Sequence, residues 1–197
     1  SPETNYLEAF NQSNVELIDL HEQPISRFTS DGIVVGDTGI KLDAVIFATG
    51  FDVMTGAMDR IDIRGREDKT LKARWADSVT SHLGMMTHGF PNLFWINGPH
   101  SPFYNPILLA EFQCDFVTEL IDGMADHGAE VIEAKVDEEH RYVQLTNDIG
   151  NSTLYPESDN YYMGDNIPGK PRATLFWFGG FPFYRKQCRL AREEWRG

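Results

Sequence analysis

An unbroken apolar run, residues 44–48 (AVIFA), constrains the fold of this chain more than any other feature. The run contains β-branched residues and stops at Thr49-Gly50, which is typical of a buried strand followed by a turn. A strand without polar alternation needs cover on both faces, as in a parallel sheet between two helix layers. A second such run, residues 93–96 (LFWI), ends in an Asn-Gly-Pro turn. Strands of this kind among helices predict an α/β fold.

The clearest helix is predicted to begin after Asn105. Asn105 can cap the first free N–H groups, and Pro106 suits the first helical position because its missing N–H has no partner there. The apolar face comprises Leu109, Phe112, Phe116, Val117, Leu120, Ile121 and Met124, and Gly128 can end the helix. Further helices are predicted at 138–149 and from about 183, strands at 15–20, near 131 and at 173–178, and a β-hairpin around 31–39. Trp75, Trp95 and Trp177 are expected to pack in or near the core.

The composition indicates an ordinary soluble globular protein with an acidic surface. Hydrophobic residues make up 41%, and 30 acidic against 17 basic side chains give a net charge of −13. This balance argues against nucleic acids and anionic membranes as partners. No apolar run approaches the roughly 18 residues of a membrane span. The two cysteines favour a reducing cytoplasm, and the six histidines form no ligand pair, so no metal is predicted.

Three segments are candidates for function. In the first, a glycine closes the predicted strand and lets a ligand approach the backbone, so Thr49, Gly50, Phe51 and Asp52 are candidate cofactor-binding residues. Spacing alone favours the alternative, a plain strand-ending turn.

The second segment, residues 98–106, leads into the helix at Asn105-Pro106, whose electropositive start suits an anion or an electron-rich carbonyl. The alternative is a capped helix with nothing bound. The third segment, residues 161–172, carries Lys170 and Arg172, a basic pair that could hold a phosphate. Here the alternative is a solvated loop.

Taken together, several segments resemble the carboxyl-terminal part of the class B flavoprotein monooxygenases, and especially the Baeyer–Villiger enzymes that act on cyclic ketones. The similar stretches are DAVIFATGFDVMTGAMDRIDIRG through LKARWADSVTSHLGMMTHGFPNLFWING, then TLYPESDNYYMGDNIPGKPR and FWFGGFPFYRKQC. The ATG segment alone is weakly specific, because it recurs in many flavoproteins that use pyridine nucleotides. Together with NIPGKPR it is strong.

The resemblance implies an incomplete two-domain, Rossmann-like FAD/NAD(P)-binding fold. Residues 1–42 would end the NADPH domain, 43–128 would return to the FAD domain, and 129–197 would form a cap on the substrate side. It also implies oxidation of a ketone to an ester or lactone with O2, FAD and NADPH. The implied cofactor-binding residues are Thr49, Gly50, Phe51, Asp52, Asn105, Pro106, Tyr161 and Lys170, and the implied substrate residues are Phe103, Tyr104, Tyr161, Thr174 and Phe176.

The sequence also departs from the family pattern. Tyr161 stands where most members carry tryptophan, and the loop at 101–105 looks shorter, so substrate preference cannot be carried over. The chain contains no GxGxxG turn and no FxGxxxHxxxW fingerprint, and the family's essential arginine would lie upstream. The chain alone is therefore expected to hold no catalytic residue, to be inactive and to need an amino-terminal FAD/NADPH portion. Self-association through uncovered apolar surface is a further expectation.

Two alternatives to ketone oxidation stay open. One is a related flavin monooxygenase that oxygenates nitrogen or sulfur, and the other is a binding module without redox chemistry.

Overall fold

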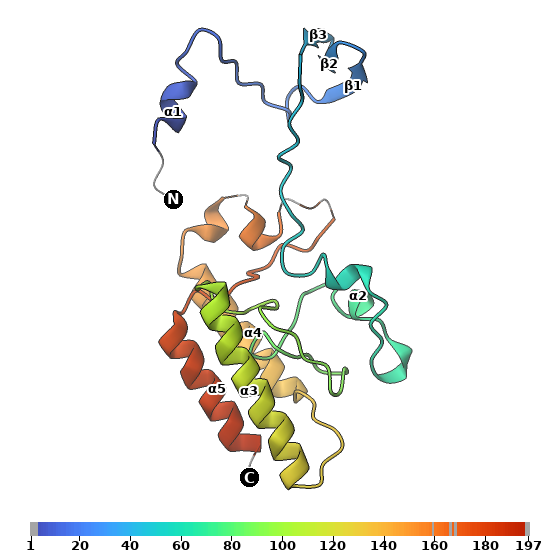
Figure 1. Ribbon diagram of the computed structural model, residues 1–197, viewed down its shortest axis with the longest axis vertical. Helices are drawn as coiled ribbons and strands as arrows, with labels where there is room; N and C mark the ends of the chain where they lie inside the picture. Colours follow the sequence, from blue (N-terminus) through green and yellow to red (C-terminus); the bar gives the residue numbers. More distant parts are fainter. Residues whose placement is uncertain (1–3, 159, 166, 168, 196–197) are drawn as a thin grey trace. The chain divides into compact units, whose positions relative to one another are not determined.

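The computed structural model describes residues 4–158, 160–165, 167 and 169–195 (Figure 1). The chain forms two compact units, Ser1–Thr49 and Gly50–Gly197. In the first unit, a short helix α1 (Tyr6–Ala9) precedes an antiparallel sheet ordered β1-β2-β3. The strands are β1 (Ile25–Thr29), β2 (Gly32–Val35) and β3 (Thr38–Lys41). The hairpin predicted around residues 31–39 is confirmed, and β1 extends it beyond what the sequence indicated.

The second unit is built on three long helices, α3 (Pro106–Asp126), α4 (Val136–Asn151) and α5 (Phe181–Trp195). Figure 1 shows α3 and α5 running side by side, and Arg192 of α5 pairs with Glu119 of α3 at 2.5 Å. All three helices contribute to one core, which therefore includes residues from both sides of the predicted boundary between residues 128 and 129. Among the residues of this unit that the structure describes, the short elements are α2 (Leu71–Arg74) and four 3-10 turns, η1 (Met58–Arg60), η2 (Arg66–Asp68), η3 (Tyr155–Glu157) and η4 (Tyr161–Met163).

The helix predictions are confirmed where sequence and packing agree. Asn105 caps α3 and Pro106 occupies its first position. The predicted helices at 138–149 and from about 183 correspond to α4, which extends two residues further at each end, and to α5, which begins two residues earlier. Trp177 is fully buried and stacks on Tyr142 of α4 with ring centroids 5.4 Å apart, while Trp75 and Trp95 are 4% and 8% exposed. These three tryptophans belong to the core, as predicted.

The strand predictions at 15–20, 44–48, 93–96, near 131 and at 173–178 are wrong as they stand, because none of these residues lies in a strand. A strand requires a hydrogen-bonded neighbour, and no other described segment forms a ladder with residues 44–48. Ile46 and Phe47 are 90% and 70% exposed instead. An apolar run therefore indicates that its side chains pack against other residues, but it does not indicate which segment those residues belong to.

The predicted strand at 173–178 does make a short parallel pairing with the turn before α3. The amide of His100 donates to the Leu175 carbonyl at 2.8 Å, and the amide of Trp177 donates to the Ser101 carbonyl at 3.0 Å. The amide of Phe103 then donates to the Trp177 carbonyl at 3.0 Å. Backbone hydrogen bonds thus hold the second candidate segment beside residues 175–177, which follow the third candidate segment in the sequence.

Replacing Asn105 with alanine is expected to destabilise the second unit by about 1 kcal/mol. The Asn105 side-chain oxygen accepts hydrogen bonds from the amides of Ile107 and Leu108, at 3.0 and 3.2 Å, and alanine cannot replace them. Urea unfolding followed by circular dichroism measures the loss. Asn105→Ser is the matched control because serine keeps a capping oxygen. Equal stability of the alanine and serine variants would contradict the role of the cap.

Across the described ranges, no helix is both long enough and apolar enough to cross a membrane.

Candidate functional site

An ion pair joins the first candidate segment to the third. The Lys170 ammonium lies 2.6 Å from Oδ1 of Asp52 and 3.0 Å from the backbone carbonyl of Val53. The Lys170 side chain is 8% exposed and that of Asp52 is 28% exposed, so the pair is largely withdrawn from water. Two predicted cofactor-binding residues, 118 positions apart in the sequence, are therefore in direct contact.

The two basic residues of the third segment have different partners. Lys170 bonds to the turn at residues 52–53, whereas Arg172 donates to the carbonyls of Pro156 and Ser158 at 2.6 and 3.3 Å. Arg172 also lies 3.6 Å from Asp165. The ammonium of Lys170 is thus engaged by a carboxylate in this arrangement, and its binding to a phosphate stays a prediction. Residues 166 and 168 of this segment lie outside the described residues.

The residues before Asp52 offer accessible backbone and side chain. Thr49 ends the first unit and is exposed. Gly50 has a φ of 81°, in the left-handed region that favours glycine, and Phe51 is 86% exposed. This exposure is compatible with a ligand at the turn, and the cofactor role of these residues stays a prediction.

Aromatic side chains from three segments gather in what we call the aromatic cluster: Phe103, Tyr155, Tyr161, Tyr162, Phe176 and Phe178. Tyr162 is its centre, with ring centroids 5.4 Å from Phe103 and 5.3 Å from Phe176. The Tyr161 ring lies 4.1 Å from that of Tyr162, and its hydroxyl group raises the pKa of Tyr162 to about 12 through a hydrogen bond, with burial as a second cause. The structure thus brings together three of the five predicted substrate residues.

The other two predicted substrate residues lie elsewhere. Tyr104 stacks on Phe181 at the start of α5, with centroids 4.5 Å apart. Thr174 is 3% exposed, and its side chain packs against Gly150 of α4, where an added Cβ atom would lie 2.6 Å from it. Contact of either residue with a substrate stays a prediction.

At the start of α3, Asn105 and Pro106 lie in a largely exposed apolar surface. Ile107 is 71% exposed, Leu108 49% and Tyr104 44%. The Asn105 side chain already binds the amides of Ile107 and Leu108, so any ligand there would rely mainly on the dipole of the helix and on the apolar surface.

Gln113 of α3 is a buried connector that the sequence analysis missed. Its side-chain oxygen accepts from the Asn97 amide at 2.7 Å, and its nitrogen donates to the Ser101 hydroxyl at 3.0 Å and the Tyr184 hydroxyl at 2.8 Å. The side chain has no exposure at all. It shares the inward face with Leu109 and Phe116, and a polar residue on an apolar stripe was the signal that could have revealed it.

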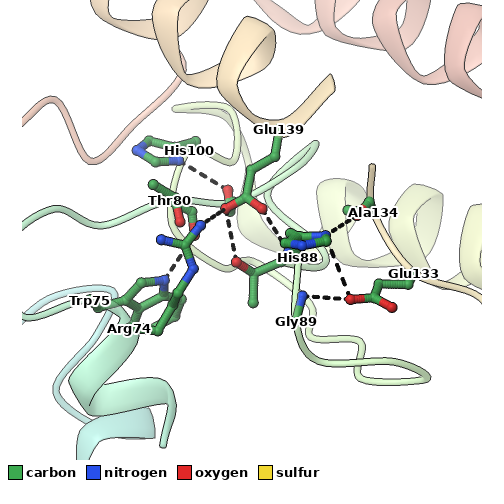
Figure 2. A network of polar contacts seen from close by, with 11 residues as sticks. Arg74, Trp75, Thr80, His88, Gly89, His100, Glu133, Ala134 and Glu139 are labelled. Atoms are coloured by element: carbon green, nitrogen blue, oxygen red, sulfur yellow. Dashed lines mark hydrogen bonds and ion pairs between the residues drawn. The ribbon is translucent and has the colours of Figure 1, made fainter. Parts of the chain in front are cut away.

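A second missed connector is Glu139 of α4, which is also fully buried. Figure 2 shows its carboxylate between Arg74 and the backbone at His88. The His88 amide donates at 2.6 Å, the Thr87 hydroxyl at 2.9 Å and the Arg74 guanidinium at 3.4 Å. Because α4 also donates the Tyr142 hydroxyl to the His100 carbonyl at 2.9 Å, it fixes the loop that ends beside the aromatic cluster.

A parallel arrangement holds the next turn of the same loop. Glu133 accepts from the Gly89 amide at 2.6 Å and pairs with Arg66 at 2.7 Å, as Figure 2 shows in part. Hydrogen bonding to Arg66 lowers the pKa of Glu133. Among the residues that the structure describes, no group of three or more His, Cys, Asp or Glu side chains is placed to hold a metal ion.

Comparison with known proteins gives consistent results. No family model matches the sequence. The chain is 41% identical over 194 residues to the FAD-binding monooxygenase VdtE of Byssochlamys spectabilis, and 39% identical over 191 residues to cyclopentanone 1,2-monooxygenase of Comamonas sp. (strain NCIMB 9872). It is 37% identical over 196 residues to the phenazine N-monooxygenase PhzNO1 of Lysobacter antibioticus. The alignments cover 95%, 96% and 98% of this chain but 34%, 35% and 36% of those proteins, so the chain spans about a third of their length.

Solved structures agree with these sequence matches. The closed crystal structure of cyclohexanone monooxygenase superposes with a TM-score of 0.89 at 36% identity, over 99% of this chain and 37% of that chain. A crystal structure of OTEMO in complex with FAD and NADP gives 0.86 at 36% identity, over 99% and 36%. The fold is therefore that of part of an FAD- and NADP-binding α/β flavoprotein, as the sequence predicted. Nearly the whole chain is thus similar to about a third of the length of Baeyer–Villiger monooxygenases, in agreement with the resemblance seen in the sequence.

Proposed function

We propose that the protein carrying this chain uses FAD, NADPH and O2 to insert one oxygen atom beside a ketone carbonyl, giving an ester or a lactone. The observation that carries the proposal is the similarity of almost the whole chain to enzymes named cyclopentanone and cyclohexanone monooxygenase. The contact between Asp52 and Lys170, and the aromatic cluster beside it, support the proposal because they unite segments singled out by the resemblance.

The residues of this chain fit one wall of such a cofactor site. The start of α3 is electropositive, carries exposed apolar side chains and suits the edge of a ring system that gains negative charge. The chain has no glycine-rich turn that could hold a pyrophosphate on a helix start, and its candidate Lys170 is paired with Asp52. Bound FAD would supply the activation of oxygen. This chain would orient the substrate and exclude water through the aromatic cluster and the adjoining loop.

The isolated 197-residue chain is therefore expected to bind FAD weakly or not at all. Calorimetry or flavin fluorescence during titration of the chain with FAD measures this directly. The control is the longer protein that carries the chain, which is expected to retain stoichiometric FAD. Tight one-to-one binding by the isolated chain would contradict the assignment of the phosphate-binding turns to other parts of the protein.

Oxygenation of nitrogen is the second candidate function, and the 37% identity to a phenazine N-monooxygenase favours keeping it. The two are separated by incubating the protein with NADPH, O2 and either cyclic ketones or nitrogen heteroaromatic compounds. Mass spectrometry of the products is expected to find esters or lactones from the ketones. N-oxides with no ester would favour the second candidate. The absence of any oxygenated product, with no NADPH consumed, would favour a binding module without redox chemistry.

A further inference from the structure

We propose that Lys170 and Asp52 form a latch that fixes the described loop residues 160–165 and 169–172 to the turn after Gly50, and that the latch positions the aromatic cluster for oxygenation. Lys170 and Asp52 would thus be positioning residues. The catalytic consequence rests on the proposed function, whereas the latch itself rests only on the geometry of the second unit.

The Lys170 side chain follows an enclosed path to its partners. Its stem crosses Gly164, where an added Cβ atom would lie 3.4 Å from both Cδ and Cε of the lysine. Gly164 has a φ of 78°, which an L side chain rarely adopts, so the backbone there leaves room for the stem. Beyond Gly164 the ammonium meets Asp52 and the Val53 carbonyl. The Lys170 side chain is thus enclosed by its neighbours, whereas most lysine side chains extend from the surface into water.

Arg172 provides an internal contrast. Its hydrogen bonds to the Pro156 and Ser158 carbonyls and its ion pair with Asp165 join neighbouring parts of the loop. Lys170 instead crosses to a segment 118 positions earlier. The loop can therefore keep its local shape without the latch while losing its attachment to the turn.

The latch lies at the end of the segment that carries Tyr161 and Tyr162. Behind these residues, the Ala173 amide donates to the Met163 carbonyl at 3.1 Å and the Leu175 amide to the Tyr162 carbonyl at 3.2 Å. These two hydrogen bonds close the loop around Lys170. Without the contact between Lys170 and Asp52, these two hydrogen bonds would have to hold the loop in place. They would then open more often, and Tyr162 would be less firmly fixed in the aromatic cluster.

The surrounding charges make the pair sensitive to removal of either member. Asp59 lies close by, and burial together with the charge of Asp52 raises its pKa, while Lys170 and Lys72 act in the opposite direction. Without Lys170, two carboxyl groups would face each other with less compensation. Without Asp52, a nearly buried ammonium would keep only one carbonyl partner, which is costly in a site that excludes water.

Hydrogen exchange tests the latch independently of catalysis. In the protein carrying this chain, Lys170→Met and Asp52→Asn are each expected to speed exchange of the Ala173 and Leu175 amides by about tenfold or more, without changing the α3 amides. The double variant is expected to lie within about twofold of the larger single effect, because both changes break one interaction. Lys69→Met is the matched control, since Lys69 forms an exposed pair with Glu67 at 3.1 Å. Unchanged exchange in Lys170→Met, or additive effects in the double variant, would overturn the latch.

Product partition tests the positioning role. With a ketone that wild type oxidises, Lys170→Met is expected to raise hydrogen peroxide released per ester formed by about tenfold, with flavin reduction by NADPH changed by less than about twofold. A stabilising role alone would lower the melting temperature without altering this ratio, and that result would overturn the proposal. If wild type forms no ester, the proposed function fails while the exchange experiment still decides whether the latch exists.

Discussion

Lowering the pH from 7 to 5 is expected to reduce the free energy of unfolding by about 4 kcal/mol, through His82 and His100 together. Burial lowers the pKa of each from 6.5 to about 4 in the folded chain. Between these values the unfolded chain binds two protons that the folded chain excludes, so stability is full above about pH 6.5 and falls as the pH approaches 4. Each histidine contributes about 2 kcal/mol of the loss at pH 5.

The surroundings of the two imidazoles explain why they stay neutral. His82 is 2% exposed and packs against the rings of Tyr142 and Trp195, and no described residue hydrogen-bonds its Nδ1. His100 is 1% exposed, with Nδ1 3.0 Å from the Ser81 hydroxyl. The charges of Glu138 and Glu139 favour the protonated form of His82, and a backbone hydrogen bond at Thr174 favours that of His100, but burial outweighs them and lowers both pKa values.

Chemical unfolding at a series of pH values measures the effect. His82→Gln and His100→Gln are each expected to remove about half of the pH-dependent loss, whatever their stability at pH 7. His140→Gln, at an exposed position of α4, is expected to keep the full wild-type slope. If the free energy of unfolding changed with pH in both His82→Gln and His100→Gln as it does in the wild type, groups other than these histidines would control acid unfolding.

Replacing Glu139 with alanine is expected to lower the free energy of unfolding by about 3–5 kcal/mol. The change leaves Arg74 without a counter-charge and the Thr87 hydroxyl and His88 amide without their acceptor, in a place where Glu139 has no exposure. The contacts between α4 and the loop at residues 82–100 are expected to be weakened most. Urea unfolding measures the stability, and hydrogen exchange of the loop amides locates the loss.

The neighbouring residue supplies the control. Glu138 forms an ion pair with Arg141 on the surface of the same helix at 2.6 Å, and Glu138→Ala is expected to cost about 0.5 kcal/mol. Both variants remove one glutamate and add one alanine to α4, so helix propensity and net charge change equally. If Glu138→Ala and Glu139→Ala lowered the free energy of unfolding equally, the buried contacts of Glu139 would contribute no more to stability than an exposed ion pair.

The sequence predicted helices and caps well because their determinants are local. Asn105, Pro106 and the apolar stripe specify α3 without reference to any other segment. The strand at 44–48 failed for the opposite reason, since a strand depends on neighbours that may be far away or in another part of a protein. The same run was nevertheless informative, because its exposed Ile46 and Phe47 mark a surface that needs cover.

The candidate site was only partly accessible from the sequence. Asp52 and Lys170 were each singled out, but their contact across 118 positions leaves no local pattern. Tyr162 was overlooked beside Tyr161, although it is the centre of the aromatic cluster, because neighbouring aromatic residues on a turn do not reveal which one points inward. Gln113 had a readable signal, a polar side chain at an inward position of an amphipathic helix.

The most direct test of the account is oxygen-isotope labelling of the reaction product. The protein carrying this chain, reconstituted with FAD and NADPH, is incubated with a cyclic ketone under 18O2, and the product is analysed by mass spectrometry. The account predicts a lactone that contains one 18O atom in the ring, with the carbonyl oxygen unlabelled. A lactone without label, or NADPH consumption that yields only a labelled N-oxide when a nitrogen substrate is supplied, would contradict ketone oxygenation as the function.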